Sequence, residues 1–98
     1  MHRILILGGT FEARRLAERL RGRANMAITL SLAGRTAAPA AQPVPVRIGG
    51  FGGAEGLAAY LRAERIAALI DATHPYAATI SQNAARAAAT AGVRLLAL

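Results

Sequence analysis

The stretch at residues 4–17, ILILGGTFEARRLA, constrains the fold more than any other part of the chain. Its four apolar residues, 4–7, end at a pair of glycines, which is typical of a short strand buried on both faces. After a turn of three residues, apolar side chains recur at positions 13, 16, 17 and 20, which is a helical spacing. A buried strand that leads at once into an amphipathic helix predicts the start of a parallel sheet.

The rest of the chain repeats this alternation, with glycines and prolines between the segments. We expect strands at residues 4–7, 26–32, 44–48, 67–71 and 93–98, and helices at residues 11–20, 54–65 and 77–91. The connection at 33–43 is rich in small residues and proline, and whether it contains a short helix stays open. The pattern predicts an α/β fold, a Rossmann-like open parallel sheet of about five strands with flanking helices.

The length of 98 residues suits one such domain. The last predicted strand has no helix after it, and a doubly wound unit normally needs a partner layer or domain to complete its cleft. We therefore expect residues 1–98 to be one Rossmann-like domain, the N-terminal half of a longer two-domain enzyme. The N-terminus has no signal-peptide pattern and no apolar run is long enough to span a membrane, so we expect a cytoplasmic protein without a membrane partner.

The net charge of +7 comes entirely from arginine, which occurs twelve times while lysine is absent. Arginine binds phosphates and carboxylates in a bidentate manner, so an anionic ligand is favoured, although genomic base composition explains this usage equally well. The arginines are scattered and no basic run is interleaved with aromatic residues, so we expect no nucleic-acid partner. Without cysteine, and with two histidines, the chain is expected to hold no metal.

The loops that follow the predicted strands, at residues 8–10, 31–36, 49–53 and 71–76, hold most of the glycines and most of the polar residues outside helices. Carboxyl ends of parallel strands form the ligand-binding edge of such a sheet, so these loops predict a site. Each loop taken singly also fits an ordinary tight turn between a strand and a helix.

In the first of these loops, Gly8 and Gly9 permit close backbone approach, and the helix that follows offers N–H groups to a phosphate. Thr10 can either cap this helix or bind the same phosphate. Glu12 stabilises the helix dipole in one interpretation and faces a cofactor in the other.

The end of the second strand distinguishes two dinucleotides. An NAD site places an acidic residue there, whereas an NADP site offers arginine to the 2′-phosphate. The sequence has Ser31, Arg35 and Thr36 and no acid, which favours NADP(H). The alternative is an ordinary solvated arginine in a loop.

Two further loops carry candidate residues. Phe51, between two glycine pairs, either closes over a flat ligand or packs against the next helix. In DATHPYA, Asp71 can cap the loop, His74 can donate a proton or hold a carboxylate, and Tyr76 can stack. On the helix that follows, Asn83 can fasten the neighbouring loop.

The segments LILGGTFEARRLA, SLAGRT, VRIGGFGG and IDATHPYA with ISQNA, in this order and spacing, resemble the N-terminal half of the precorrin-6A reductase family. GGFGG and DATHPYA are the most specific of them, and the resemblance covers nearly all 98 residues. The family reduces a double bond of a polycarboxylate tetrapyrrole, precorrin-6A or its cobalt form, with NADPH on the route to vitamin B12. Its members are longer, which implies a further C-terminal domain.

The resemblance also implies roles for individual residues. The resemblance implies three groups of cofactor-binding residues, at the phosphates, at the 2′-phosphate end and along the cleft near the nicotinamide and the macrocycle: Gly8, Gly9 and Thr10; Ser31, Arg35 and Thr36; Gly50, Phe51, Gly52, Gly53 and Thr73. Glu12 is a further candidate at the cofactor, and His74 and Tyr76 are the candidate catalytic residues. The alternative function is a non-catalytic nucleotide-binding module that senses nucleotide for a partner.

Overall fold

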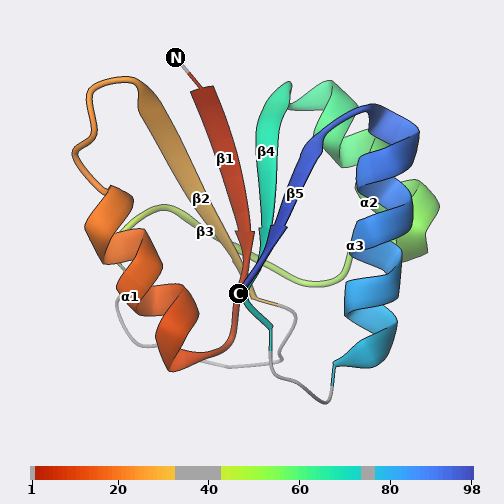
Figure 1. The fold of residues 1–98 in the computed structure, drawn as a ribbon, viewed down its shortest axis with the longest axis horizontal. Helices are drawn as coiled ribbons and strands as arrows, with labels where there is room; N and C mark the ends of the chain where they lie inside the picture. The colour runs from red at the N-terminus through yellow and green to blue at the C-terminus, as the bar shows by residue number, and fades with distance from the viewer. Residues whose placement is uncertain (1, 33–42, 74–76) are drawn as a thin grey trace.

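The computed structural model describes residues 2–32, 43–73 and 77–98, and within them five parallel strands form one sheet. The elements in chain order are β1 (His2–Leu7), α1 (Phe11–Leu20), β2 (Met26–Leu32), β3 (Val46–Ile48), α2 (Gly53–Ala63), β4 (Ile66–Asp71), α3 (Ala78–Ala91) and β5 (Arg94–Ala97). All strand arrows in Figure 1 point to the same end of the molecule. The predicted α/β fold with a five-stranded parallel sheet is confirmed.

The strand order is β3-β2-β1-β4-β5, so the chain changes direction once across the sheet. It runs outward from β1 through β2 to β3, then crosses back to β4 on the other side of β1 and continues to β5. The reversal lies between β1 and β4. In open α/β sheets, ligands bind outside the carboxyl ends of the strands at this point.

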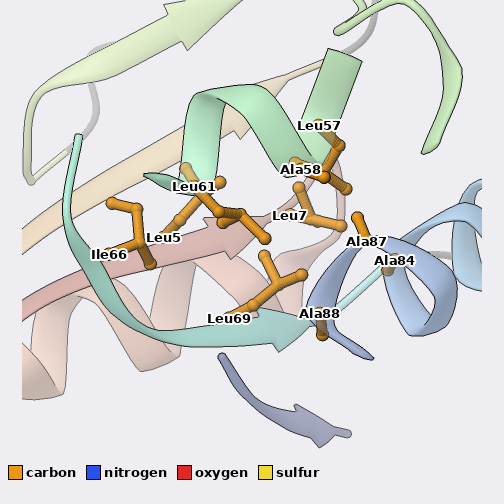
Figure 2. Packing of buried hydrophobic residues seen from close by; sticks show 10 residues of the cluster. All are labelled: Leu5, Leu7, Leu57, Ala58, Leu61, Ile66, Leu69, Ala84, Ala87 and Ala88. Atoms are coloured by element: carbon orange, nitrogen blue, oxygen red, sulfur yellow. The ribbon is translucent and has the colours of Figure 1, made fainter. Parts of the chain in front are cut away.

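Helices cover both faces of the sheet, with α1 on one face and α2 and α3 together on the other (Figure 1). Successive side chains of a strand point to opposite faces, so β1 contributes to both cores. Ile4 and Ile6 pack with Ala13 and Ala17 of α1. On the other face, β1 packs with β4, α2 and α3 (Figure 2), and the residues of this core are Leu5, Leu7, Leu57, Ala58, Leu61, Ile66, Leu69, Ala84, Ala87 and Ala88.

The predicted ranges 11–20 and 26–32 match α1 and β2 at both ends, and the other boundaries differ by at most two residues, most clearly at β3 and at the end of α2. The predicted strand 44–48 begins only at Val46, because Val44 is buried in the α1 core and Pro45 has no N–H to donate. The predicted helix 54–65 ends at Ala63, and Arg65 has a φ of 52° that no continuing helix allows. The connection at 33–42 lies outside the described residues.

In the part of the chain that the structure describes, no helix is long and apolar enough to span a membrane.

Candidate functional site

Among the described residues, two hollows lie at the loops that follow the carboxyl ends of the strands. The first, which we call the α2–α3 cleft, encloses about 190 Å³ between the loop at 49–53 and the start of α3. Its walls are mainly apolar, from Leu7, Phe51, Leu57 and Ile80. The second, the α1 depression, lies at the start of α1 beside the end of β4. Thr73 borders both hollows.

The turn after β1 has one half-buried glycine in close contact with its neighbours and one exposed glycine. The Gly8 N–H donates to the Ser31 carbonyl at 2.9 Å, and a Cβ on Gly8 would lie 2.5 Å from the Leu30 Cδ1 and 3.2 Å from the Ala13 Cβ. Gly9 has a φ of 109° with open space around it. Gly8 therefore lets β2 and α1 approach closely, while Gly9 presents its backbone to the α1 depression.

Thr10 caps α1 and at the same time joins the ends of β1 and β4. Its Oγ1 accepts from the Ala13 N–H at 3.1 Å and donates to the Ala72 carbonyl at 2.7 Å. The cap is the role that the structure confirms for this residue. Since the one hydroxyl proton is already donated to Ala72, a phosphate at this turn would depend on backbone N–H groups instead.

Glu12 occupies the first turn of α1, where it is exposed and lines the α1 depression together with Phe11 and Leu98. A carboxylate in this position interacts favourably with the positive end of the helix dipole. Phe11 and Leu98 are 69% and 71% exposed, so the depression combines an apolar rim with one negative charge.

Ser31 at the end of β2 is buried, at 4% exposure, and lines the α2–α3 cleft. In the sheet, Leu7 pairs with Ser31 and with Asp71, and Ser31 pairs with Arg47. Residues in register on parallel strands point to the same face, so all four lie on the α2–α3 side. Among the described residues the Ser31 hydroxyl has no hydrogen-bond partner, which leaves it available to a group in the cleft.

The glycine-rich loop between β3 and α2 is held by Arg47. The guanidinium donates to the carbonyls of Gly49 and Gly50 at 2.8 and 3.0 Å and lies over the Phe51 ring, 3.8 Å from its centroid. Phe51 also packs edge-on against Tyr60 of α2, with centroids 5.1 Å apart. Phe51 is thus packed against α2, as one of the two interpretations of the sequence expected, and it lines the cleft as well.

Gly56 allows this loop to lie directly on α2. A Cβ on Gly56 would overlap the carbonyl oxygen of Phe51 and would lie 2.7 Å from its carbonyl carbon. Gly52, in a left-handed conformation with φ 88°, precedes the helix and provides no side-chain cap. The first N–H groups of α2 therefore have no capping bond from the side chain of the N-cap residue.

Asp71 organises the loop after β4. Its Oδ1 accepts from the Thr73 N–H at 3.1 Å and from the Thr73 hydroxyl at 2.6 Å, and the Ser81 hydroxyl lies 3.4 Å from that of Thr73. Burial alone would raise the pKa of Asp71, but the hydroxyls of Ser81 and Thr73 and the Thr73 N–H outweigh it and lower the pKa below the ordinary value. The carboxylate is therefore ionised at neutral pH and fixes Thr73 between the two hollows.

Residues 3–98 match the family model of "Precorrin-6x reductase CbiJ/CobK". The chain belongs to this family. It is 62% identical over 96 residues to the precorrin-6A reductase of Sinorhizobium sp. This match covers 98% of the present chain and 37% of that relative. The chain is also 40% identical over 94 residues to the cobalt-precorrin-6A reductase of Salmonella typhimurium. This match covers 94% of the present chain and 35% of that relative.

A solved structure of CobK precorrin-6A reductase superposes on the fold with a TM-score of 0.93 at 54% identity, covering 100% of this chain and 39% of that one. The chain thus spans about two fifths of the length of the CbiJ/CobK proteins it matches.

The structure distributes the predicted site residues of this family member over the two hollows. Those in the α2–α3 cleft are Gly8, Ser31, Gly50, Phe51, Gly52, Gly53 and Thr73. Those in the α1 depression are Gly9, Thr10, Glu12 and again Thr73. The predicted residues Arg35, Thr36, His74 and Tyr76 lie outside the described part of the chain.

Two contributions to the site were not predicted. Arg47 holds the glycine-rich loop, and Gly56 supports it from α2. Asn83, which the sequence suggested for fastening the neighbouring loop, lines the cleft from α3. An isolated glycine in a helix that is otherwise rich in alanine and leucine indicates close packing, so Gly56 carried a signal in the sequence. The position of Asn83 depends on how α3 packs against the loop, which no local pattern encodes.

Proposed function

We propose that this chain is the NADP(H)-binding half of a precorrin-6A reductase of cobalamin biosynthesis. The full enzyme would reduce a double bond of precorrin-6A, or of cobalt-precorrin-6A, to give precorrin-6B. The observation that carries the cofactor assignment is the end of β2. Here the buried Ser31, whose hydroxyl has no hydrogen-bond partner among the described residues, takes the place of the acid of an NAD site. The substrate assignment is supported by the relatives, which are a precorrin-6A reductase and a cobalt-precorrin-6A reductase.

The two hollows suit the two halves of a dinucleotide. The α2–α3 cleft includes the end of β2, which in doubly wound folds takes the adenosine ribose, so we assign this cleft to the adenosine half. Ser31, with Arg35 and Thr36, would hold the 2′-phosphate. The backbone of the turn at Gly8 and Gly9 would take the pyrophosphate, at the N-terminus of α1.

The nicotinamide half would then lie toward the α1 depression, beside Thr10, Glu12 and Thr73. NADPH supplies the hydride when bound, and the chain's own residues position the reacting groups. Thr10 and Asp71 hold the loop after β4 in place, and we propose that His74 and Tyr76 act on the substrate from that loop. The positive net charge favours approach of a substrate with many carboxylates. The remaining part of the site would come from residues outside this chain.

The cofactor assignment is tested by titrating the protein with NADPH and NADH. We expect NADPH to bind at least about tenfold more tightly, and Arg35→Ala to remove most of this preference, because charge-assisted hydrogen bonds to the phosphate are lost. Arg86→Ala, at an exposed arginine on α3, is the matched control and should leave the preference unchanged. Equal affinity of the unmodified protein for both nucleotides would overturn the assignment.

The enzymatic assignment is tested separately, with the full-length protein that carries this chain. NADPH oxidation that depends on added precorrin-6A supports the reductase. Nucleotide binding without turnover of precorrin-6A or its cobalt form would instead favour the non-catalytic nucleotide-sensing module.

A further inference from the structure

We infer that the α2–α3 cleft recognises the adenine base itself and that the side-chain amide of Asn83 reads its edge. This inference rests on the proposed NADP(H) function and assigns a base-specific contact within it. Asn83 lies on α3, three residues after Ile80, so both side chains project from the same face of the helix into the cleft.

The size of the cleft suits one ring system. Its volume of about 190 Å³ is smaller than the roughly 300–1,000 Å³ of pockets that enclose a whole drug-sized ligand. Phe51 and Leu57 form one apolar side and Ile80 the other, an arrangement that accepts the flat faces of an aromatic ring. The cleft therefore holds a base, while the rest of the dinucleotide extends along the edge of the sheet.

The position of the cleft identifies which ring this is. Ser31, at the end of β2, borders the same space, and the ribose that binds at the end of β2 is the one attached to adenine. The nicotinamide ring belongs to the other mononucleotide half, across the reversal of strand order. The ring between Phe51 and Ile80 is therefore the adenine.

Asn83 has the chemistry to distinguish adenine from other bases. A carboxamide offers one acceptor and one donor side by side, which match the N6 amino group and the N7 of adenine. Among the described residues, the Asn83 side chain has no hydrogen-bond partner, and the rest of the cleft wall around it is apolar. Ser31 and Thr73 are other polar side chains of the cleft. The Ser31 hydroxyl suits the ribose or a phosphate, whereas the Thr73 hydroxyl, which donates to Asp71, can only accept from a ribose hydroxyl.

The test compares NADPH with its hypoxanthine analogue, in which the N6 amino group is replaced by an oxygen. The analogue leaves the Asn83 carbonyl without a donor, so we expect the protein to bind NADPH about tenfold more tightly than the analogue. Asn83→Ala and Asn83→Leu should each reduce this ratio to near one, since both remove the amide and with it the acceptor for the N6 amino group. Gln82→Ala, at the exposed neighbouring position on α3, is the control and should retain the ratio.

The outcomes separate this inference from the proposed function. If the unmodified protein binds NADPH and the analogue equally, or if Asn83→Ala retains the preference, the base-reading role is wrong while the NADP(H) site stands. If the unmodified protein binds neither nucleotide, the proposed function itself fails. Circular dichroism of each variant verifies the fold, and Asn83→Leu, which preserves side-chain size without an amide, keeps the test valid if the alanine variant unfolds.

Discussion

Gly56→Ala places two opposing effects at one position of α2. In an exposed helix interior, alanine is more favourable than glycine by about 0.8–1 kcal/mol, so helix propensity alone predicts a more stable protein. At Gly56, however, the added Cβ would overlap the Phe51 carbonyl oxygen and lie 2.7 Å from its carbon, against an ordinary contact of 3.4 Å or more. Both are backbone atoms, so the loop itself has to move.

Displacement of the loop at Phe51 would affect more than its contact with position 56. Moving Phe51 from α2 disturbs its packing on Tyr60 and the two hydrogen bonds from Arg47 to the loop carbonyls, each contributing about 0.5–1.5 kcal/mol. Inserting a methyl group into a packed contact costs about 1–3 kcal/mol in itself. After the gain in helix propensity, we expect Gly56→Ala to lower the free energy of unfolding by about 1–3 kcal/mol.

Chemical denaturation followed by circular dichroism measures this change. In a domain of this size each kcal/mol corresponds to about 4–8 °C in Tm, so thermal unfolding resolves it too. Ala59→Gly, at an exposed position of the same helix, calibrates the propensity effect and should destabilise by about 1 kcal/mol. The double variant with Arg47→Ala should destabilise by less than the sum of the single changes, because both act on one loop. A more stable Gly56→Ala protein, or strictly additive effects, would refute this reasoning.

The remaining predictions concern the other end of the site. Asp71→Asn should lower stability at neutral pH by about 1–3 kcal/mol, because a buried carboxylate loses its charge-assisted bonds with Thr73. The pKa of Asp71 is lowered in the folded protein, so the contribution of its carboxylate to stability is complete above the ordinary value of 3.8 and is lost as the pH falls through the folded pKa. The stabilities of the unmodified protein and the Asp71→Asn variant should therefore converge in acid unfolding curves. A difference that stays constant with pH would contradict this. Thr10→Ala should lower the free energy of unfolding, measured by urea denaturation, by about 1–2 kcal/mol, because the hydrogen bonds to the Ala13 N–H and the Ala72 carbonyl are both lost. Thr10→Ser should retain most of the stability. Equal losses in both variants would show that the hydroxyl does not provide this stabilisation.

The elements of the fold could be predicted because their patterns are local. The buried run in β1, the helical spacing in α1 and the glycines after the first three strands are visible within a dozen residues. The predicted start of β3 was less accurate. Val44 is apolar like a strand residue, yet it precedes β3 and packs in the hydrophobic cluster on the α1 face of the sheet. A short apolar run does not reveal which neighbour buries it.

The sequence predicted that the candidate site lies at one edge of the sheet, but it did not predict how the site residues divide between the two hollows. The sequence places Ser31 and the glycine loops at the same edge because parallel strands end together. Which hollow each residue borders depends on the face that each helix covers, and this is set by packing between α2 and α3. The contact of Arg47 with Phe51 has the same origin, since the bend of the loop brings together residues that a straight strand would separate.

The segment 71–73 explains how one edge can serve both halves of an extended ligand. Thr73 borders the α2–α3 cleft and the α1 depression, so a dinucleotide that occupies both has to cross it. This crossing is fixed from both sides, by the Thr10 hydroxyl on the Ala72 carbonyl and by Asp71 on the N–H and hydroxyl of Thr73. A crossing that is ordered before binding loses little conformational entropy when the ligand arrives. The Asp71 carboxylate would repel the cofactor phosphates, but its charge is buried and directed to Thr73, so it organises the crossing without facing the ligand.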